Sequence, residues 1–427
     1  MKNASLRLPY GLPPFRLSPE SADSIDSIGS VLLHDGAILD DHTDLIRAMM
    51  LRTVSTIIVV NTYSDALQNL LEFRLFTSVI VLAPLTRSRS YGGFAQPHAA
   101  LYYGQRTTSG GLLITEATGI SLTADGVPNT PSCYTDEHVA AWRPVVKAVH
   151  DKGGIFFVQL WHVGRQSHTA YQPNGTPPAS PTSKRLETGM ITLPDGKTRA
   201  PFSQPRKLET HEISSLVQDF VTAAKQARAA GFDGVEIHAA NGYLLDQFMK
   251  DSINDRTDQY GGSIENRCRF PLEVVDAVID AIGAERVGFR LSPHADYGDS
   301  RDSQPMALAA YMAEQLSKRS VVYAHYLEPR NKDAGEHESS VPSVWPFRKK
   351  FKGVLIATGG YGRKEGMKAV NNGKADCIGY GRHFLANPDL PKRIRLNAAL
   401  NKANPATYSI PDPVVGYTDY PSLEEEM

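Results

Sequence analysis

The chain has 427 residues, and its 45 basic and 46 acidic side chains nearly cancel to a net charge of −1. This balance predicts no electrostatic partner such as nucleic acid or an anionic membrane. The three cysteines (Cys133, Cys268 and Cys377) have no C-x-x-C spacing, so we expect buried thiols, not a disulfide framework or a metal site. No apolar run approaches the ~20 residues of a membrane helix, and neither end carries a secretory or peroxisomal signal, so a cytoplasmic protein is expected.

Residues 1–72 do not share the pattern of the rest of the chain, and we expect them to form an atypical, partly disordered N-terminal extension. Ser18–Ser30 is polar and has little apolar surface with which to offset the entropy of ordering. Ile57–Val60 is apolar, and we expect it to pack against the domain that follows, because an exposed apolar tract promotes aggregation.

From residue 73 to residue 427, short apolar runs alternate with helical patterns. One helix is predicted from Ile213 to Ala224 and beyond, with apolar residues three or four apart and Gly231 as its stop. Continuous apolar strands alternating with helices indicate a parallel sheet covered by helices, and about eight repeats favour a closed (β/α)8 TIM barrel. The predicted strands are Val79–Leu82, Leu112–Thr115, Ile155–Leu160, Val235–His238, Val287–Leu291, Val321–Tyr326, Val354–Ala357 and Asp376–Gly379.

A long connection without clear periodicity, Gln166–Arg206, follows the third predicted strand. Connections of this length are uncommon unless they are lids or binding loops. On a barrel it would overhang the carboxyl-terminal face, where such folds place their chemistry.

The fourth strand leads into His238, Asn241 and Tyr243. The first two can donate N–H groups and the third carries a weakly acidic hydroxyl. Two donors and a proton source suit reduction next to a carbonyl group, where charge develops on oxygen and a carbon needs a proton. The alternative is that His238 is a satisfied core histidine and Tyr243 a packing aromatic.

Polar residues and glycines follow the other strands, and a barrel would gather them at one mouth. Gly359-Gly360 and Gly381-Arg382 follow the last two strands, where barrels often bind phosphate through backbone N–H groups and a fixed cation. Gln159 and Arg290 end two other strands, although a core amide and a paired structural charge would explain them equally well. A barrel that binds a phosphorylated cofactor is therefore favoured.

Several segments together resemble the flavin-dependent Old Yellow Enzyme family, with the greatest similarity to plant 12-oxophytodienoate reductases. The resemblance covers roughly Val79 to Pro421. It rests on Pro84-Leu85-Thr86, Gln159-Leu160-Trp161-His162, His238-Ala239-Ala240-Asn241-Gly242-Tyr243, Asn254–Ser263, Tyr380-Gly381-Arg382 and Gly416–Pro421. It implies a TIM barrel that holds FMN and reduces activated alkenes with NADPH.

The resemblance also implies roles for individual residues. Pro84, Leu85, Thr86, Ala117, Gln159 and Arg290 would bind the flavin ring system, and Gly360, Gly381 and Arg382 its phosphate. His238 and Asn241 would bind the carbonyl oxygen of an α,β-unsaturated substrate, and Tyr243 would protonate the α-carbon. Arg330 and Tyr408 would line the substrate pocket.

The sequence departs from the family before the first strand. Family members have an F-x-L-x-x-R motif there, but Phe73-Arg74-Leu75 is followed by Phe76-Thr77-Ser78, without the arginine. One alternative is therefore a barrel with impaired folding or passive flavin binding. Another is a flavin-free phosphosugar enzyme that uses the same phosphate site, with Glu116 or Glu328 as an enolising base. The partner in the favoured reading is a small enone, bound by a monomer or weak homodimer.

Overall fold

The computed structural model describes residues 31–32, 38–39, 79–328 and 344–424. The chain divides into two units, Met1–Glu72 and Phe73–Met427. In the first unit, β1 (Val31–Leu32) pairs antiparallel with β2 (Ile38–Leu39). The expectations for Ser18–Ser30 and Ile57–Val60 lie outside the described residues, so the assignment of residues 1–72 stays a prediction.

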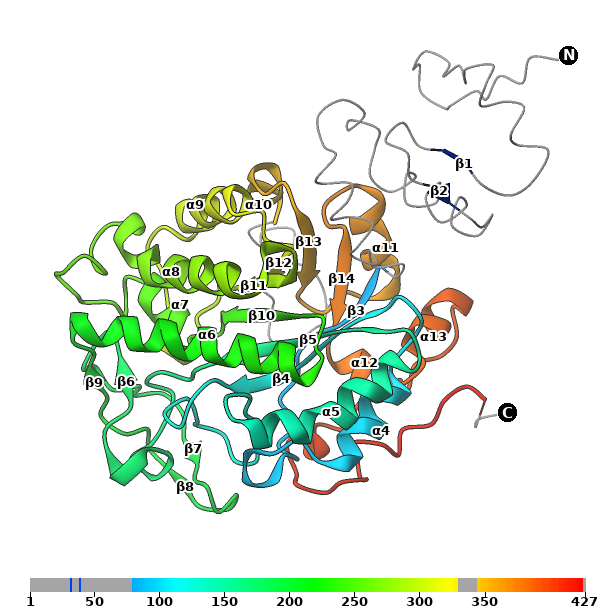
Figure 1. Cartoon of the computed structure of the whole chain (residues 1–427), viewed down its shortest axis with the longest axis horizontal. Helices are drawn as coiled ribbons and strands as arrows, with labels where there is room; N and C mark the ends of the chain where they lie inside the picture. Colours follow the sequence, from blue (N-terminus) through cyan, green and yellow to red (C-terminus); the bar gives the residue numbers. More distant parts are fainter. Residues whose placement is uncertain (1–30, 33–37, 40–78, 329–343, 425–427) are drawn as a thin grey trace, which may run out of the picture. The chain divides into compact units, whose positions relative to one another are not determined.

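The second unit is a closed barrel of eight parallel strands with helices around it, which confirms the predicted fold (Figure 1). The strands follow one another around the barrel in chain order, and the last pairs with the first. They are β3 (Ile80–Leu82), β4 (Leu112–Gly119), β5 (Ile155–Trp161), β10 (Gly234–Ala239), β11 (Val287–Leu291), β12 (Tyr323–Leu327), β13 (Val354–Thr358) and β14 (Cys377–Tyr380).

Mostly apolar side chains fill the barrel interior at the amino-terminal ends of the strands. Phe157, Tyr323 and Ile356 belong to one buried cluster inside the strands, together with Cys377. A larger cluster lies between the outer faces of the strands and the helices. Because both faces of each strand are buried, their sequences read as continuous apolar runs, as in β5.

The helices on the outside of the barrel begin and end close to the predicted signals. Helix α6 (Ile213–Ala230) ends at Gly231, which has a left-handed φ of 102° that favours glycine. The other helices are α4 (Pro97–Gln105), α5 (Asp136–His150), α7 (Leu244–Met249), α8 (Ile264–Ile282), α9 (Pro305–Lys318), α10 (Trp345–Lys350), α11 (Arg363–Asn371), α12 (Arg382–Ala386) and α13 (Leu390–Leu396).

Two segments differ from the sequence-based expectations. Strand β4 continues four residues beyond Thr115, through a register shift between Ile114 and Ala117. The connection from Gln166 to Arg206 contains small sheets: β6 (Ala179–Ser180) pairs with β9 (Arg206–Lys207), and β7 (Ile191–Thr192) with β8 (Arg199–Ala200). Pairs of two residues are too short to produce a detectable period in the sequence.

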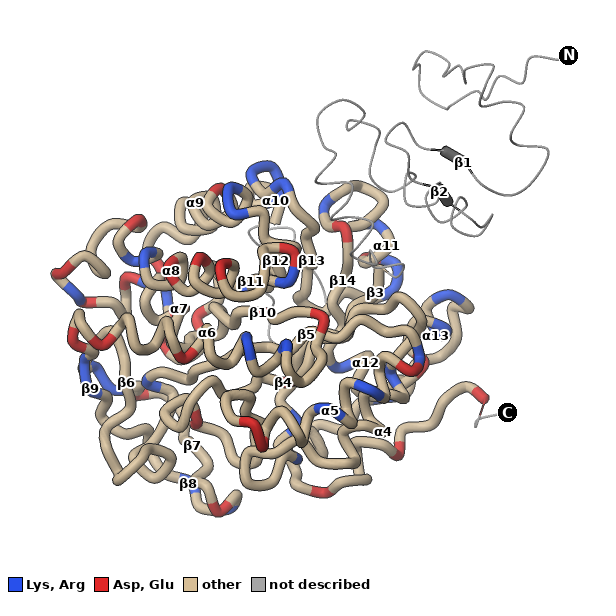
Figure 2. Tube along the Cα trace, viewed as in Figure 1, with Lys and Arg blue, Asp and Glu red and all other residues tan. Residues whose placement is uncertain are grey.

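Charged residues of both signs are scattered along the described part of the chain (Figure 2). Among these residues, no helix is long and apolar enough to cross a membrane, and no group of three or more His, Cys, Asp or Glu could hold a metal ion. The three cysteines are buried free thiols, as predicted.

Candidate functional site

The barrel brings together polar side chains that lie far apart in the sequence. The strand register pairs His238 of β10 with Arg290 of β11, and Arg290 with His325 of β12. Gln159 of β5 pairs with Glu236 of β10. Side chains paired across neighbouring strands lie on the same face of the sheet, so these residues form a polar layer inside the barrel, above the apolar cluster.

A buried hydrogen-bonded network connects this layer. The Gln159 Nε2 donates to Glu236 Oε1 at 2.7 Å, and His325 Nδ1 lies 2.8 Å from the other carboxylate oxygen. His325 also bonds the Thr358 hydroxyl. Burial disfavours the Glu236 carboxylate, but His325, Arg290 and Gln159 outweigh it, and the pKa of Glu236 is lowered. The network therefore holds an anion beneath the barrel mouth.

His238 is a neutral N–H donor. Its Nδ1 accepts the Ala240 backbone N–H at 3.3 Å, which leaves the proton on Nε2. Burial, with Arg290 and His325 nearby, lowers the pKa of His238 well below its ordinary value. The imidazole therefore stays uncharged at neutral pH and presents one N–H group.

Asn241 is held by its backbone in a left-handed conformation, with φ of 60°. Its N–H donates to Ser292 Oγ at 2.9 Å, and its carbonyl oxygen accepts from Gln166 Nε2 at 2.9 Å. Asparagine adopts the left-handed conformation at a lower conformational energy than most other residues. The two contacts fix the backbone on both sides of the residue.

Gly242 continues this turn, with φ of 73°. A Cβ at this position would lie 2.1 Å from the carbonyl oxygen of Tyr297, so a side chain cannot fit without a shift of backbone. The Gly242 N–H donates to Asp246 Oδ2 at 2.8 Å. Asp246 is 1% exposed, and burial raises its pKa to about 6 despite the nearby Lys250. The turn is therefore braced by a buried carboxyl group on α7.

Tyr243 lies next to His238, with the ring centroids 5.1 Å apart and the planes at 83°. Trp161 meets the same ring edge-on, with centroids 5.1 Å apart. Burial raises the pKa of Tyr243 to about 12, and Arg290 opposes this shift. The hydroxyl is therefore protonated at neutral pH, as a proton donor must be.

The predicted flavin-lining residues border the same region. Residues 84–86 follow β3 after one intervening residue, with the first buried and the others partly buried. Ala117 is buried in a small cluster with Trp161, against which Tyr243 packs, and the register pairs Ala117 with Gln159. The lengthened β4 thus delivers Ala117 to the mouth.

Arg290 has a buried hydrogen-bond donor that no protein group in the described regions satisfies. Its side chain is 7% exposed, and within the described part of the chain its buried Nε has no hydrogen-bond partner. Burial lowers the pKa of Arg290, and the nearby Glu236 carboxylate opposes this shift. The guanidinium nevertheless remains charged at any physiological pH. A buried N–H of a cation without an acceptor is costly, so it indicates an acceptor supplied by a bound group.

The predicted phosphate residues lie at the ends of β13 and β14. Gly360 has φ of 73°, and a Cβ on Gly381 would meet Leu85 at 3.1 Å. Arg382 begins α12 and is exposed. Glycine turns and an exposed guanidinium after the last two strands fit a phosphate group. Together with Arg290, these residues fit a phosphorylated cofactor with hydrogen-bond acceptors on its ring system.

Of the two residues predicted to line the substrate pocket, the structure describes only one. Arg330 lies outside the described residues. Tyr408 is partly buried after a short 3-10 helix, and burial raises its pKa while Arg382 opposes the shift. The Tyr408 carbonyl oxygen accepts from Arg87 Nε and Arg89 Nη1, both at 3.3 Å.

Three residues near the mouth were missed by the sequence reasoning. Glu236 and His325 form the buried network, and their signal was a charged or polar residue within an apolar strand. His294 follows β11 by three residues, and its buried Nε2 has no hydrogen-bond partner in the described regions. Burial, with Lys250 nearby, lowers the pKa of His294 to about 4, so it is a neutral imidazole.

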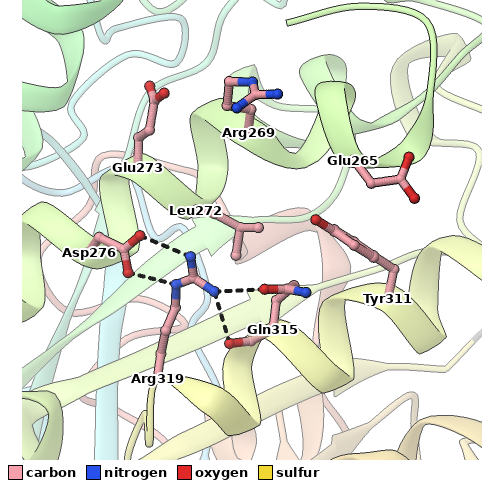
Figure 3. Close-up of a pocket in the computed structure, with 8 residues that line it drawn as sticks. All are labelled: Glu265, Arg269, Leu272, Glu273, Asp276, Tyr311, Gln315 and Arg319. Carbon is pink, nitrogen blue, oxygen red and sulfur yellow. Dashed lines mark hydrogen bonds and ion pairs between the residues drawn. The ribbon is translucent and has the colours of Figure 1, made fainter. Parts of the chain in front are cut away.

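A hollow of about 250 Å³ lies on the outer helix layer, between α8 and α9 (Figure 3). Arg319 bonds Asp276 at 2.6 Å and Gln315 at 3.0 Å across it. Arg319 and Asp276 in this hollow already pair with each other, and the hollow lies between two helices on the outside of the barrel. The barrel mouth is therefore the candidate functional site.

Comparisons with known proteins agree with this geometry. Residues 73–401 match the NADH:flavin oxidoreductase / NADH oxidase family. The chain is 57% identical to 12-oxophytodienoate reductase 2 of Arabidopsis thaliana, over 81% of this chain and 92% of that protein. It is 56% identical to 12-oxophytodienoate reductase 1 of Oryza sativa subsp. japonica, over 81% and 90%.

Among solved structures, morphinone reductase in complex with tetrahydroNAD is 45% identical, with a TM-score of 0.77 over 82% of this chain and 96% of the other. A mutant of morphinone reductase with the same ligand is 46% identical, with a TM-score of 0.76 over 81% and 93%. The resemblance to Old Yellow Enzymes inferred from the motifs is confirmed, and the chain belongs to the NADH:flavin oxidoreductase / NADH oxidase family.

Proposed function

We propose that this protein is an FMN-dependent ene-reductase that reduces the C=C bond of α,β-unsaturated carbonyl compounds with NADPH. The observation that carries the proposal is the pair of rings at the mouth: a neutral His238 with its proton on Nε2, edge to face with a protonated Tyr243. One group can donate a hydrogen bond and the other a proton. The names of the relatives favour a cyclic enone similar to 12-oxophytodienoate as the natural substrate.

The cofactor would be held by the residues that the sequence predicted. Pro84, Leu85, Thr86 and Ala117 would contact its ring system, and Gly360, Gly381 and Arg382 its phosphate. Arg290 would give its free Nε–H to a ring acceptor. Glu236 already uses one N–H of the Gln159 amide, which fixes the orientation of that amide and leaves its other groups for the ring.

The reaction at the substrate divides between donors and acid. His238 Nε2–H and the Asn241 amide would donate to the carbonyl oxygen, withdraw electron density from the conjugated double bond and stabilise the negative charge that develops on oxygen. Bound FMN, once reduced, would supply hydride to the β-carbon. Tyr243 would then deliver its phenolic proton to the α-carbon. Arg330 and Tyr408 would shape the pocket around the rest of the substrate.

The order of these events follows from acidity. A phenol with a pKa of about 12 is a weak acid, so it transfers its proton only to a carbon on which negative charge has developed. The donors at the carbonyl oxygen therefore act before or with the proton donor. Because His238 and Asn241 are both uncharged donors, neither adds a second positive charge beside Arg290.

The test begins with the absorbance spectrum of the purified protein, which should show bound oxidised flavin. Anaerobic NADPH should bleach this spectrum, and 2-cyclohexenone should restore it with formation of cyclohexanone. Cyclohexene, which has the double bond but no carbonyl group, is the matched control and should not restore the colour. A parallel titration with NADH decides which nucleotide is the better reductant.

Each alternative gives a different result. A flavin-free phosphosugar enzyme would be colourless, and a passive flavin binder would be bleached slowly or would not be reoxidised by the enone. Reduction of cyclohexene at the same rate as the enone would show that the carbonyl-binding pair does not activate the substrate.

A further inference from the structure

Three arginines outside the reacting groups are completely buried: Arg87 and its neighbour Arg89 after β3, and Arg106 after α4, at 0%, 1% and 1% exposure. They lie against Tyr102 and Tyr417, whose rings stack in parallel with centroids 4.2 Å apart. Arg106 Cζ is 3.8 Å from the Tyr102 centroid, and Arg89 Cζ is 4.7 Å from that of Tyr417. We call these five residues the arginine–tyrosine stack.

Negatively charged side chains are too few to explain how the three arginines of the arginine–tyrosine stack are stabilised in the protein interior. Glu116 faces the stack and accepts the Arg87 backbone N–H at 3.0 Å. Burial raises the pKa of this carboxyl to about 7, although Arg87 and Arg89 oppose the shift. Within the described part of the chain, Glu116 is the one carboxyl group that faces these three guanidinium groups, so aromatic faces and backbone carbonyls must supply most of their stabilisation.

The Arg106 guanidinium donates to the carbonyl oxygens of Tyr102 at 3.0 Å and Tyr417 at 3.2 Å, and it also binds the segment that follows the last strand. Its Nη2 donates to the carbonyl oxygen of Leu385 at 2.6 Å and its Nε to that of Phe384 at 3.2 Å. Both carbonyls belong to α12, which starts at Arg382 and is preceded by Gly381. The contacts therefore fix the short segment whose first residues are the proposed phosphate ligands.

The Arg89 guanidinium donates hydrogen bonds to a different segment, residues 407–415. Its Nη2 donates to the carbonyl oxygens of Thr407 at 3.1 Å and Val415 at 2.9 Å, and its Nε to that of Asp412 at 2.5 Å. These bonds close the loop that contains Tyr408. Arg89 has no contact with α12 among its hydrogen bonds in the described residues.

We propose that Arg106 and Arg89 are positioning residues for two different ligands: Arg106 holds the Gly381–Arg382 turn for the FMN phosphate, and Arg89 holds Tyr408 for the substrate. This inference rests on the proposed function. A planar fork with five donors can hold several carbonyls in a fixed geometry, which the point charge of lysine cannot do. Arg106→Lys and Arg89→Lys therefore keep the charge and remove the geometry.

The experiment compares two flavins that differ only in the phosphate. Apoprotein of the wild type and of each variant is titrated with FMN and with riboflavin, following the quenching of flavin fluorescence. In Arg106→Lys we expect FMN affinity to fall by about tenfold or more, the loss typical of a hydrogen bond to a charged group, while riboflavin affinity stays within about twofold. Arg382→Ala, which removes the phosphate ligand itself, sets the upper limit of this selective loss.

Arg89→Lys is the matched control for the cofactor. Its affinities for FMN and riboflavin should both match the wild type. The FMN-loaded variant should show a KM for the enone that is raised several-fold, with the rate of reduction by NADPH unchanged. Near-UV circular dichroism checks that each variant is folded. If Arg106→Lys does not fold, Tyr102→Leu, which removes the aromatic face beneath Arg106, is tested for the same selective loss of FMN.

Three outcomes overturn the inference. One is an equal loss of FMN and riboflavin in Arg106→Lys, which would indicate a general structural role. Another is loss of FMN in Arg89→Lys to the same extent as in Arg106→Lys. The third is wild-type behaviour of both variants. A wild-type chain that binds neither flavin would overturn the proposed function and this inference with it, so the two failures are distinguishable.

Discussion

Replacing Tyr243 with phenylalanine removes the proposed proton donor and leaves the rest of the site in place. The ring makes edge contacts with Trp161 and His238, and phenylalanine keeps both of them. Any loss of activity would therefore report the hydroxyl group and not a change in packing.

The size of the effect follows from the acidity of the group. Positioned acids contribute ~10²–10⁴-fold to a rate, which corresponds to ~3–5 kcal/mol of activation free energy. Burial raises the pKa of Tyr243 to about 12, which makes it a weaker acid than tyrosine in water. We therefore expect a loss near the lower limit, about 10²-fold in the rate of enone reduction.

Stopped-flow absorbance separates the two half-reactions of the FMN-loaded enzyme. Reduction by NADPH should match the wild type, because no proton is delivered to a carbon in that step, while reoxidation by the enone should slow. Tyr311→Phe, on the outer helix α9, is the control for loss of a hydroxyl elsewhere. Equal slowing of both half-reactions in Tyr243→Phe would refute the assigned role.

Three further predictions concern the end of β10, the turn that follows it and the start of α7. His238→Ala and Asn241→Ala should each bind phenolate ligands about 10- to 150-fold more weakly, because each loses a hydrogen bond to an anion worth ~1.5–3 kcal/mol; unchanged affinity in a spectral titration would remove that residue from the carbonyl site. Gly242→Ala should lower the free energy of unfolding by ~1–3 kcal/mol more than Gly196→Ala, because both positions have positive φ but a Cβ meets backbone only at the first; equal urea midpoints would contradict this. The pKa of Asp246 is raised from 3.8 to about 6 by burial, so the native state loses stability relative to the unfolded state as pH rises between these values. Asp246→Asn should lack this loss of about 2 kcal/mol between pH 4 and pH 7, and parallel pH profiles of unfolding for the two proteins would show that the shift is absent.

Local sequence patterns were sufficient to predict the barrel. The strands are largely buried on both faces, so most of their residues are apolar, and glycines such as Gly231 mark where helices stop. The motif from His238 to Tyr243 was also recognisable, because its residues are close together in the chain and carry their chemistry in their side chains.

The environment of those residues was decided by the tertiary structure. Glu236, His325 and Gln159 come from three strands, and they meet only because barrel closure and register bring them to the same level. The tautomer of His238 and the acidity of Tyr243 depend on burial and on neighbours from other strands, so no local pattern reveals them.

The arginine–tyrosine stack illustrates the same limit over a longer distance. Arg89 and the carbonyl oxygen of Val415 that it contacts are separated by 326 residues. Arginine side chains are mostly exposed in proteins, and nothing in the sequence marks these three as buried. Their partners are backbone carbonyls, which every residue possesses, so the sequence carries no signal for the pairing, and folding alone determines which carbonyls they bind.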